Sequence, residues 1–300
     1  MLTTDKFPGW DRVDGSSVSE TEIEEAFQAV MDHALRLEAA SLSLRRRRKA
    51  RWLAALVGVA AALFLFAVPY SAYRYVQTQQ PEPVLAALQE YTTAQGEVRE
   101  VLLPDGSKVV LNAESVLICP DRFGAERSVY LSGEAIFDVT ASETEPFLVR
   151  TSDMTVRVHG TRFNVKAYFD DPQVTATLNR GSIAVWPNQS PERRVELQPE
   201  QFFAFDRATG SVIRGKVNSA EAMSWEGGNL CFRSESIYEI IRVIQRRYGV
   251  HVYLTTSRYD REKITARFVH GETVDELLDA ICSVIPGMKY ERTDEGIRIR

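Results

Sequence analysis

The sequence is poor in the residues that usually build metal centres and disulfide frameworks. It contains three cysteines and four histidines in 300 residues. Cys119, Cys231 and Cys282 are odd in number, far apart and embedded in apolar surroundings, which argues against a zinc site and against a disulfide framework. We interpret them as buried single thiols, with a Cys231–Cys282 bridge as the lesser alternative. We expect no metal and no cofactor.

Signatures of catalysis are equally scarce. The chain has no Walker, dinucleotide-binding or nucleophile-elbow pattern. No pair of carboxylates is arranged as an acid and a base, and no histidine is followed by a second metal ligand at a recognisable interval. We therefore expect that the chain is not a conventional enzyme, which makes a membrane-tethered hydrolase the weakest of the functions considered.

One long apolar run is present. Trp52 to Tyr73 is a stretch of twenty-two residues without a charge, and a membrane-spanning helix needs about 20. The run is too long, and begins too far into the chain, for a cleaved signal peptide. It predicts a transmembrane helix within residues 50–76.

Positive charge is concentrated on one side of this run. Six cations precede it, namely Arg45, Arg46, Arg47, Arg48, Lys49 and Arg51, whereas Arg74 is the single cation in the seventeen residues that follow. By the positive-inside rule the N-terminus lies in the cytoplasm and the C-terminal part lies outside. The basic run is then better interpreted as a topogenic signal than as a nucleic-acid patch.

The segment before the span, residues 1–49, contains one amphipathic helix. Ser19 and Glu22 have the spacing of a capping box. Apolar residues recur behind it at helical spacing, chiefly Ile23, Phe27, Val30, Met31 and Leu37. One short helix cannot bury its own apolar stripe. We favour a helix that binds a partner protein, with a spacer lying on the bilayer as the alternative.

Beyond a polar linker, residues 77–95, the pattern changes to strands. Residues 96–215 alternate apolar and polar positions in short runs, for example at Val129 and Leu131 and at Phe163 and Val165. Turn signals separate the runs, among them PDG at Pro104–Gly106 and DDP at Asp170–Pro172. This pattern predicts an antiparallel all-β domain.

After a connector, residues 216–228, a repeat appears in residues 229–300. SESIYEIIRVIQRRYG and GETVDELLDAICSVIPG align at an offset of thirty-seven residues. Each begins with a capping box, Ser236 with Glu239 and Thr273 with Glu276, and each has strands on both sides. Two β-α-β units therefore predict a small α+β domain. Its strand edges can accept a strand from a partner; the alternative is a domain that only stabilises its neighbour.

Several ordered blocks from about Gly96 to the C-terminus resemble one known family. They are LPDGSKVVLNAESVL (Leu103–Leu117), RSVYLSGEAIFDV (Arg127–Val139), PFLV (Pro146–Val149), VHGTRFNVKAY (Val158–Tyr168), TLNRGSIAV (Thr177–Val185) and WEGGNLCFRSESIYEIIRVIQRRYGV (Trp225–Val250). The resemblance is to the FecR family of transmembrane anti-sigma regulators, especially its Bacteroidetes branch. In that family the C-terminal region resembles the secretin/TonB short N-terminal fold.

The resemblance implies a location and a set of partners. Such proteins are single-pass proteins of the inner membrane, and hold an extracytoplasmic-function sigma factor on the cytoplasmic side. Their periplasmic C-terminal region, here residues 229–300, contacts the signalling domain of a TonB-dependent outer-membrane transporter. We expect periplasmic and intramembrane proteases to release the signal. The N-terminal segment departs from many relatives, whose anti-sigma domain is longer and has several helices.

Within VHGTRFNVKAY, Gly160 and Thr161 interrupt a predicted strand. Some family members cleave themselves at this Gly-Thr bond, by attack of the threonine hydroxyl on the preceding carbonyl and an N→O acyl shift. The resemblance therefore implies a single-turnover self-cleavage at Gly160–Thr161, and His159 could assist the proton transfer. The alternative is that Gly160 marks a bulge or bend and Thr161 merely packs.

A function of another class remains open. The chain could be an envelope structural or glycan-binding protein with no sigma-factor partner. Exposed aromatic residues such as Trp186 and Trp225 would then form the binding platform.

Overall fold

The structure is a computed structural model that describes residues 25, 58, 63–75, 87–124 and 126–300. The chain divides into two units, residues 1–84 and 85–300. In the first unit residues 63–75 are helical and their side chains are exposed. No helix among the described residues is both long enough and apolar enough to cross a membrane.

Most of the predicted N-terminal features lie outside the described residues. These are the greater part of the predicted span, the basic run from Arg45 to Arg51, and the apolar stripe of Ile23, Phe27, Val30, Met31 and Leu37. Within the predicted amphipathic helix, Glu25 is described; it is helical and exposed. The membrane span and the partner-binding stripe therefore stay predictions.

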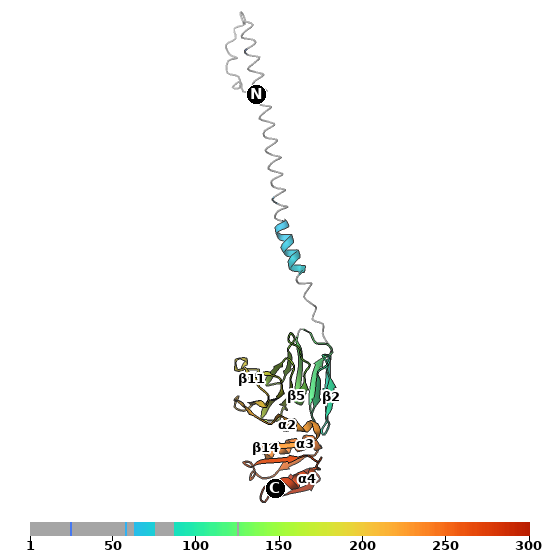
Figure 1. Cartoon of the computed structure of the whole chain (residues 1–300), viewed down its shortest axis with the longest axis vertical. Coiled ribbons are helices and arrows are strands. Elements are labelled where there is room, and N and C mark those ends of the chain that lie inside the picture. The colour runs from blue at the N-terminus through green and yellow to red at the C-terminus, as the bar shows by residue number, and fades with distance from the viewer. Residues whose placement is uncertain (1–24, 26–57, 59–62, 76–86, 125) are drawn as a thin grey trace, which may run out of the picture. The chain divides into compact units, whose positions relative to one another are not determined.

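The second unit begins with two β-sheets that share one long strand, β5 (Arg127–Asp138) (Figure 1). The first sheet has the order β1 (Leu88–Thr92), β4 (Val116–Pro120), β5, β6 (Phe147–Arg150), β7 (Met154–Val158), β10 (Ile183–Pro187), β11 (Val195–Leu197). The second has the order β2 (Arg99–Leu102), β3 (Lys108–Leu111), β5, β8 (Arg162–Ala167), β9 (Gln173–Arg180), β12 (Gln201–Asp206), β13 (Val212–Lys216). A short 3-10 helix, η2 (Pro191–Arg193), lies between β10 and β11.

Gly133 lies where β5 passes from one sheet to the other. Residues up to Ser132 pair with β4 in the first sheet, and Gly133 to Asp138 pair with β8 in the second. The φ of Gly133 is 109°, and a Cβ there would lie 2.6 Å from the Cα of Ser115. Only glycine combines this backbone conformation with so close an approach.

The core lies between the two sheets. The predicted alternation is confirmed, because Val129, Leu131, Phe163 and Val165 are all buried. Phe137 stacks on Phe163 with ring centroids 5.2 Å apart. Burial of large side chains of this kind contributes about 1.5–3 kcal/mol each.

Two features of this domain differ from the prediction. The predicted linker, residues 77–95, contains strand β1, which pairs with β4. The domain is all-β as expected but not wholly antiparallel, because β5 and β6 are parallel. The reason is that β5 ends in the second sheet, and the chain then returns to the first half of the same strand, where Arg127 faces Phe147.

The C-terminal residues form the predicted α+β domain. It contains β14 (Leu230–Ser236), α3 (Ile237–Tyr248), β15 (Val252–Leu254), β16 (Lys263–Phe268), α4 (Val274–Val284), β17 (Tyr290–Thr293) and β18 (Gly296–Ile299). Both predicted capping boxes are present, Ser236 with Glu239 and Thr273 with Glu276. The predicted connector holds two short helices, α2 (Ser219–Ala222) and the 3-10 helix η3 (Ser224–Gly227).

The strand pairing of this domain joins the two repeats. β14 pairs with β16, so the first strands of the two units lie together. β15 pairs in parallel with β18, and β18 pairs with β17. One shared core results, in which Ile240 and Ile244 of α3 and Leu277 and Ile281 of α4 are buried.

Candidate functional site

Helix α3 of the C-terminal domain meets the β8–β9 turn of the sandwich through Arg246. Its Nη2 lies 2.5 Å from Asp170 Oδ1 and 2.8 Å from Asp171 Oδ1. Its guanidinium carbon lies 3.6 Å from the centre of the Tyr168 ring, a cation–π contact. A charged residue of one domain is therefore buried against the other.

Asp171 is the centre of this ion cluster. Lys166 Nζ lies 3.1 Å from its Oδ2, and Arg242 Nε lies 3.0 Å from its Oδ1. Burial alone would raise the pKa of Asp171, but Lys166 and Arg246 outweigh it and hold that pKa below its ordinary value. Three cations thus converge on one buried carboxylate.

Arg207 holds the β8–β9 turn from the sandwich side. Its Nη1 donates to the carbonyl oxygens of Tyr168, Phe169 and Asp171 at 2.6, 2.9 and 2.6 Å. Its Nη2 donates to the carboxylate of Asp153 at 2.8 Å. The turn that receives Arg246 is therefore fixed by side-chain bonds as well as by the flanking strands.

A second contact joins α3 to the segment after β1. The backbone N–H of Gly96 donates to the carbonyl oxygen of Arg246 at 2.8 Å. Arg247 Nη2 donates to the carbonyl oxygen of Gly228 at 2.6 Å. The end of α3 thus contacts both the entry to the sandwich and the connector.

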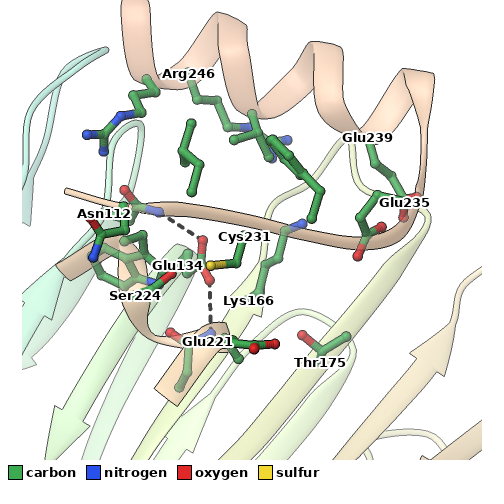
Figure 2. A pocket seen from close by; sticks show the side chains of 18 of the residues that line it. Asn112, Glu134, Lys166, Thr175, Glu221, Ser224, Cys231, Glu235, Glu239 and Arg246 are labelled. Carbon is green, nitrogen blue, oxygen red and sulfur yellow. Dashed lines mark hydrogen bonds between the residues drawn. The ribbon is translucent and has the colours of Figure 1, made fainter. Parts of the chain in front are cut away.

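A cavity of about 210 Å³ lies between α3, the connector and the sheet of the sandwich that contains β8 and β9 (Figure 2). Glu134 lies in its wall, where it accepts hydrogen bonds from Asn112 Nδ2 and Asn164 Nδ2, each at 2.9 Å. Lys166 is half-buried in the same wall; burial would lower its pKa, but Asp171 and Glu134 raise it above the ordinary value. The cavity is therefore polar and carries both signs of charge.

Glu235 and Glu239 both line this cavity, and their pKa values are shifted in opposite directions. Burial, with a hydrogen bond to Glu239 and its charge, raises the pKa of Glu235 from 4.5 to about 7. The pKa of Glu239 is lowered, because its bonds to Glu235 and to Ser236 outweigh its burial. At neutral pH this pair is therefore partly protonated.

The three residues proposed for self-cleavage occupy the connection between β7 and β8. Because these strands belong to different sheets, the bend predicted at Gly160 is present, and a Cβ there would lie 2.7 Å from the Cα of Ala141. Thr161 is buried, and its hydroxyl donates to the carbonyl oxygen of Ser182 at 3.0 Å. The His159 ring instead lies 3.2 Å from the carbonyl oxygen of Ser142.

Two predictions about single residues are wrong. Trp225 is not an exposed platform, because it is 7% exposed and packs with Met223 and Ile136; Trp186 is partly buried and lies under Arg194. Cys231 and Cys282 are both free, so the lesser alternative of a bridge is wrong. Cys119 is buried as expected, and burial raises its pKa to about 11, whereas Cys231 and Cys282 are only half-buried.

The ion cluster was not found from the sequence. The stretch DDP predicts only a turn, and Arg246 lies within a segment that predicts only an amphipathic helix. Arg242 and Arg246 are four residues apart and so share a helix face. The sequence signal for the ion cluster consists of two arginines beside an apolar stripe and two adjacent aspartates in a turn. Nothing in the sequence shows that these two pairs of residues meet.

Comparisons with known proteins agree with this architecture. The family model described as FecR protein matches residues 89–201, and the one described as FecR, C-terminal matches residues 229–299. Two crystal structures of a candidate anti-sigma factor from Parabacteroides distasonis ATCC 8503 are similar, each with TM-score 0.67, 29% identity, and coverage of 71% of this chain and 98% of theirs. No curated protein matches the chain. Since the two family models together cover more than half of the sequence, the chain belongs to the FecR family.

Proposed function

We propose that the chain is an inner-membrane anti-sigma regulator that holds an extracytoplasmic-function sigma factor and responds to a TonB-dependent outer-membrane transporter. One observation carries the proposal. The two FecR segments follow one another as folded domains, after a twenty-two-residue apolar run with a basic N-terminal flank. A folded module outside the cell membrane and a short segment inside it are the parts that a transmembrane regulator needs.

On the cytoplasmic side, the sigma factor would bind the stripe of Ile23, Phe27, Val30, Met31 and Leu37. Burial of each large side chain would contribute about 1.5–3 kcal/mol to binding. Glu25 is exposed and belongs to the opposite face of a helix with this stripe. The helix would thus offer one apolar face to its partner.

On the periplasmic side, the transporter's signalling domain would bind residues 229–300. Support comes from the open strand edges of this domain. Strands β15 and β17 each pair only with β18, and β14 pairs only with β16, in the described part of the chain. Edge strands offer unpaired N–H and C=O groups to a partner strand.

Release of the sigma factor would proceed by regulated proteolysis. A single transmembrane helix transmits rotation poorly, whereas a change in exposure of a cleavage site needs no rigid lever. The bond from Gly96 to Arg246 supports this sequence of events, because it links α3 to the segment that follows β1. A transporter domain bound near α3 would disturb the segment that leads toward the membrane.

The cytoplasmic contact is tested with the full chain. The tagged protein is solubilised from its native membranes, and proteins that co-purify are identified by mass spectrometry. Phe27→Glu places a charge in the apolar stripe, and Ala29→Glu places the same charge on the opposite face of the predicted helix. We expect a sigma factor to co-purify with the wild type and with Ala29→Glu. With Phe27→Glu we expect its recovery to fall at least tenfold, which corresponds to a loss of about 1.4 kcal/mol of binding free energy.

The opposite result has a definite meaning. Equal recovery of the sigma factor from both variants would show that the stripe is not the contact. Absence of any sigma factor from all three samples would contradict the anti-sigma function itself and favour an envelope-binding module.

The topology is tested separately with alkaline phosphatase fusions, which are active only outside the cytoplasm. A fusion after Arg300 should be active and a fusion after Leu44 inactive. The reverse pattern would place residues 229–300 in the cytoplasm and contradict the proposed transporter contact.

A further inference from the structure

Three buried polar atoms around the interdomain cavity have no hydrogen-bond partner in the described part of the chain. They are Trp225 Nε1, Arg246 Nη1 and Asn164 Oδ1. Trp225, Arg246 and Asn164 are 7%, 5% and 4% exposed, and all three line the cavity. A buried polar group without a partner costs about 1–3 kcal/mol. Three such groups around one cavity indicate a binding site.

The orientation of these groups is set by their other bonds. Asn164 turns its amide nitrogen to Glu134, which leaves its Oδ1 as a free acceptor. Arg246 uses Nη2 for Asp170 and Asp171, which leaves Nη1 as a free donor. The site therefore offers donors from Trp225 and Arg246 and an acceptor from Asn164.

The charges around the cavity favour a neutral ligand. Its lining includes the acids Glu134, Glu221, Glu235 and Glu239 and the bases Lys166, Arg246 and Arg247. Several of these charges already have a partner, because Lys166 and Arg246 pair with Asp171, and Glu221 pairs with Arg233. Neither an anion nor a cation gains a net attraction here, whereas a hydroxyl group can both accept from Trp225 and donate to Asn164.

The size and walls of the cavity restrict the ligand further. The cavity has a volume of about 210 Å³. This volume is below the usual range for drug-sized ligands, roughly 300–1,000 Å³. Trp225 and Phe232 add aromatic surface to the polar groups, and such mixed walls suit a ring that carries hydroxyls on an apolar frame.

We infer that this cavity binds a small neutral polyhydroxylated molecule of monosaccharide size. The ligand contacts three parts of the second unit: Asn164 in β8, Trp225 in η3 and Arg246 in α3. A ligand that binds this closed arrangement stabilises it by mass action. It would therefore strengthen the contact between the sandwich and the C-terminal domain. The inference does not depend on the identity of the cytoplasmic partner.

The experiment uses the full chain in lipid nanodiscs and isothermal titration calorimetry. Glucose, galactose, arabinose and glycerol are the neutral probes, and pyruvate and ethanolamine are the charged ones, all at millimolar concentration. We expect at least one monosaccharide to bind with one site per chain, and the charged probes to bind more weakly. If none of the neutral probes gives a heat of binding, the cavity is filled by water alone and the inference is overturned. Tighter binding of a charged probe would overturn it as well.

Two substitutions place the binding in this cavity. Trp225→Phe removes the indole donor and keeps an aromatic ring, and Thr177→Val removes a hydroxyl from the lining at constant volume. We expect each to weaken binding about fivefold, the effect of one lost hydrogen bond. Trp186→Phe changes the same residue type outside the cavity and should bind like the wild type. Unchanged affinity in both cavity variants, with melting curves that confirm folding, would overturn the assignment.

Discussion

Arg246 and Asp171 form an ion pair 2.8 Å long whose side chains are 6% and 4% exposed. They belong to different domains, α3 and the β8–β9 turn. A buried pair of this kind adds little stability in total, because both charges lose their water. Removal of one partner is costly, however, since the other is left buried and uncompensated. The pair therefore holds the two domains in one specific arrangement.

The first prediction concerns Asp171→Asn. This change keeps the shape of the side chain but leaves Arg246, Arg242 and Lys166 without their shared carboxylate. We expect a loss of about 3–5 kcal/mol in the free energy of unfolding. Urea denaturation of the purified chain measures it.

Asp170→Asn is the matched control. Asp170 also contacts Arg246, but its side chain is 61% exposed. Exposed ion pairs contribute about 0–1 kcal/mol, so this variant should unfold close to the wild type. Equal losses in the two variants would show that burial at Asp171 is not what makes its charge important.

The second prediction is a pH dependence from Glu235. Its pKa in the folded chain is about 7 against an ordinary 4.5, so the folded state binds more protons than the unfolded state between these values. Stability therefore falls as the pH rises from about 4.5 to 7. The loss is at most about 3 kcal/mol, and less after screening by solvent.

The adjoining groups act in other pH ranges or oppose the effect. Glu239 has a lowered pKa, so its contribution is lost only as the pH falls below the ordinary value. Lys166 and Lys263 lower the pKa of Glu235 and so reduce the slope of stability against pH. Glu235→Gln should abolish the slope, while Glu295→Gln, in the exposed β17–β18 turn, should keep it. An unchanged slope in Glu235→Gln would assign the pH dependence to other groups.

The elements of this fold could be predicted where one local pattern decides them. Both C-terminal helices begin at the predicted capping boxes, because the two side chains of a capping box satisfy backbone groups only a few residues away. The sandwich strands follow the apolar alternation for a similar reason, since side chains on a strand face opposite sides in turn.

Pairings over long sequence distances could not be predicted in this way. The parallel pairing of β5 with β6 depends on the passage of β5 from one sheet to the other. The cluster around Asp171 joins residues more than seventy positions apart, as with Arg242. No pattern within a single segment contains this information, and the same is true of the cavity and its unpaired atoms.

The third prediction concerns Gly133, where β5 changes sheets. In Gly133→Ala the new Cβ would lie 2.6 Å from the Cα of Ser115. Ser115 also accepts a hydrogen bond from the backbone N–H of Glu134 at 2.9 Å, so it cannot move without a further loss. We expect about 2–4 kcal/mol of destabilisation in urea denaturation.

Gly227→Ala is the control for this change. A Cβ at Gly227 would meet Asn229 Nδ2 at an ordinary distance of 3.8 Å. The variant should stay within about 0.5 kcal/mol of the wild type. A Gly133→Ala protein as stable as the control would mean that β5 tolerates a side chain at its bend.

The last prediction tests the proposed self-cleavage at Gly160–Thr161. The Thr161 hydroxyl donates to the Ser182 carbonyl, and Thr161 is 1% exposed. Attack on the Gly160 carbonyl requires the hydroxyl to give up that bond, and His159 to leave the Ser142 carbonyl if it is to take the proton. The chain carries a tag at each end and is followed by immunoblotting over time. If the reaction occurs, the wild type yields two fragments that meet at this bond. Thr161→Ser keeps a hydroxyl and should yield them too, whereas Thr161→Ala should stay intact. A wild type that stays as intact as Thr161→Ala would contradict self-cleavage, and Thr161 would then act only in packing the connection between the two sheets.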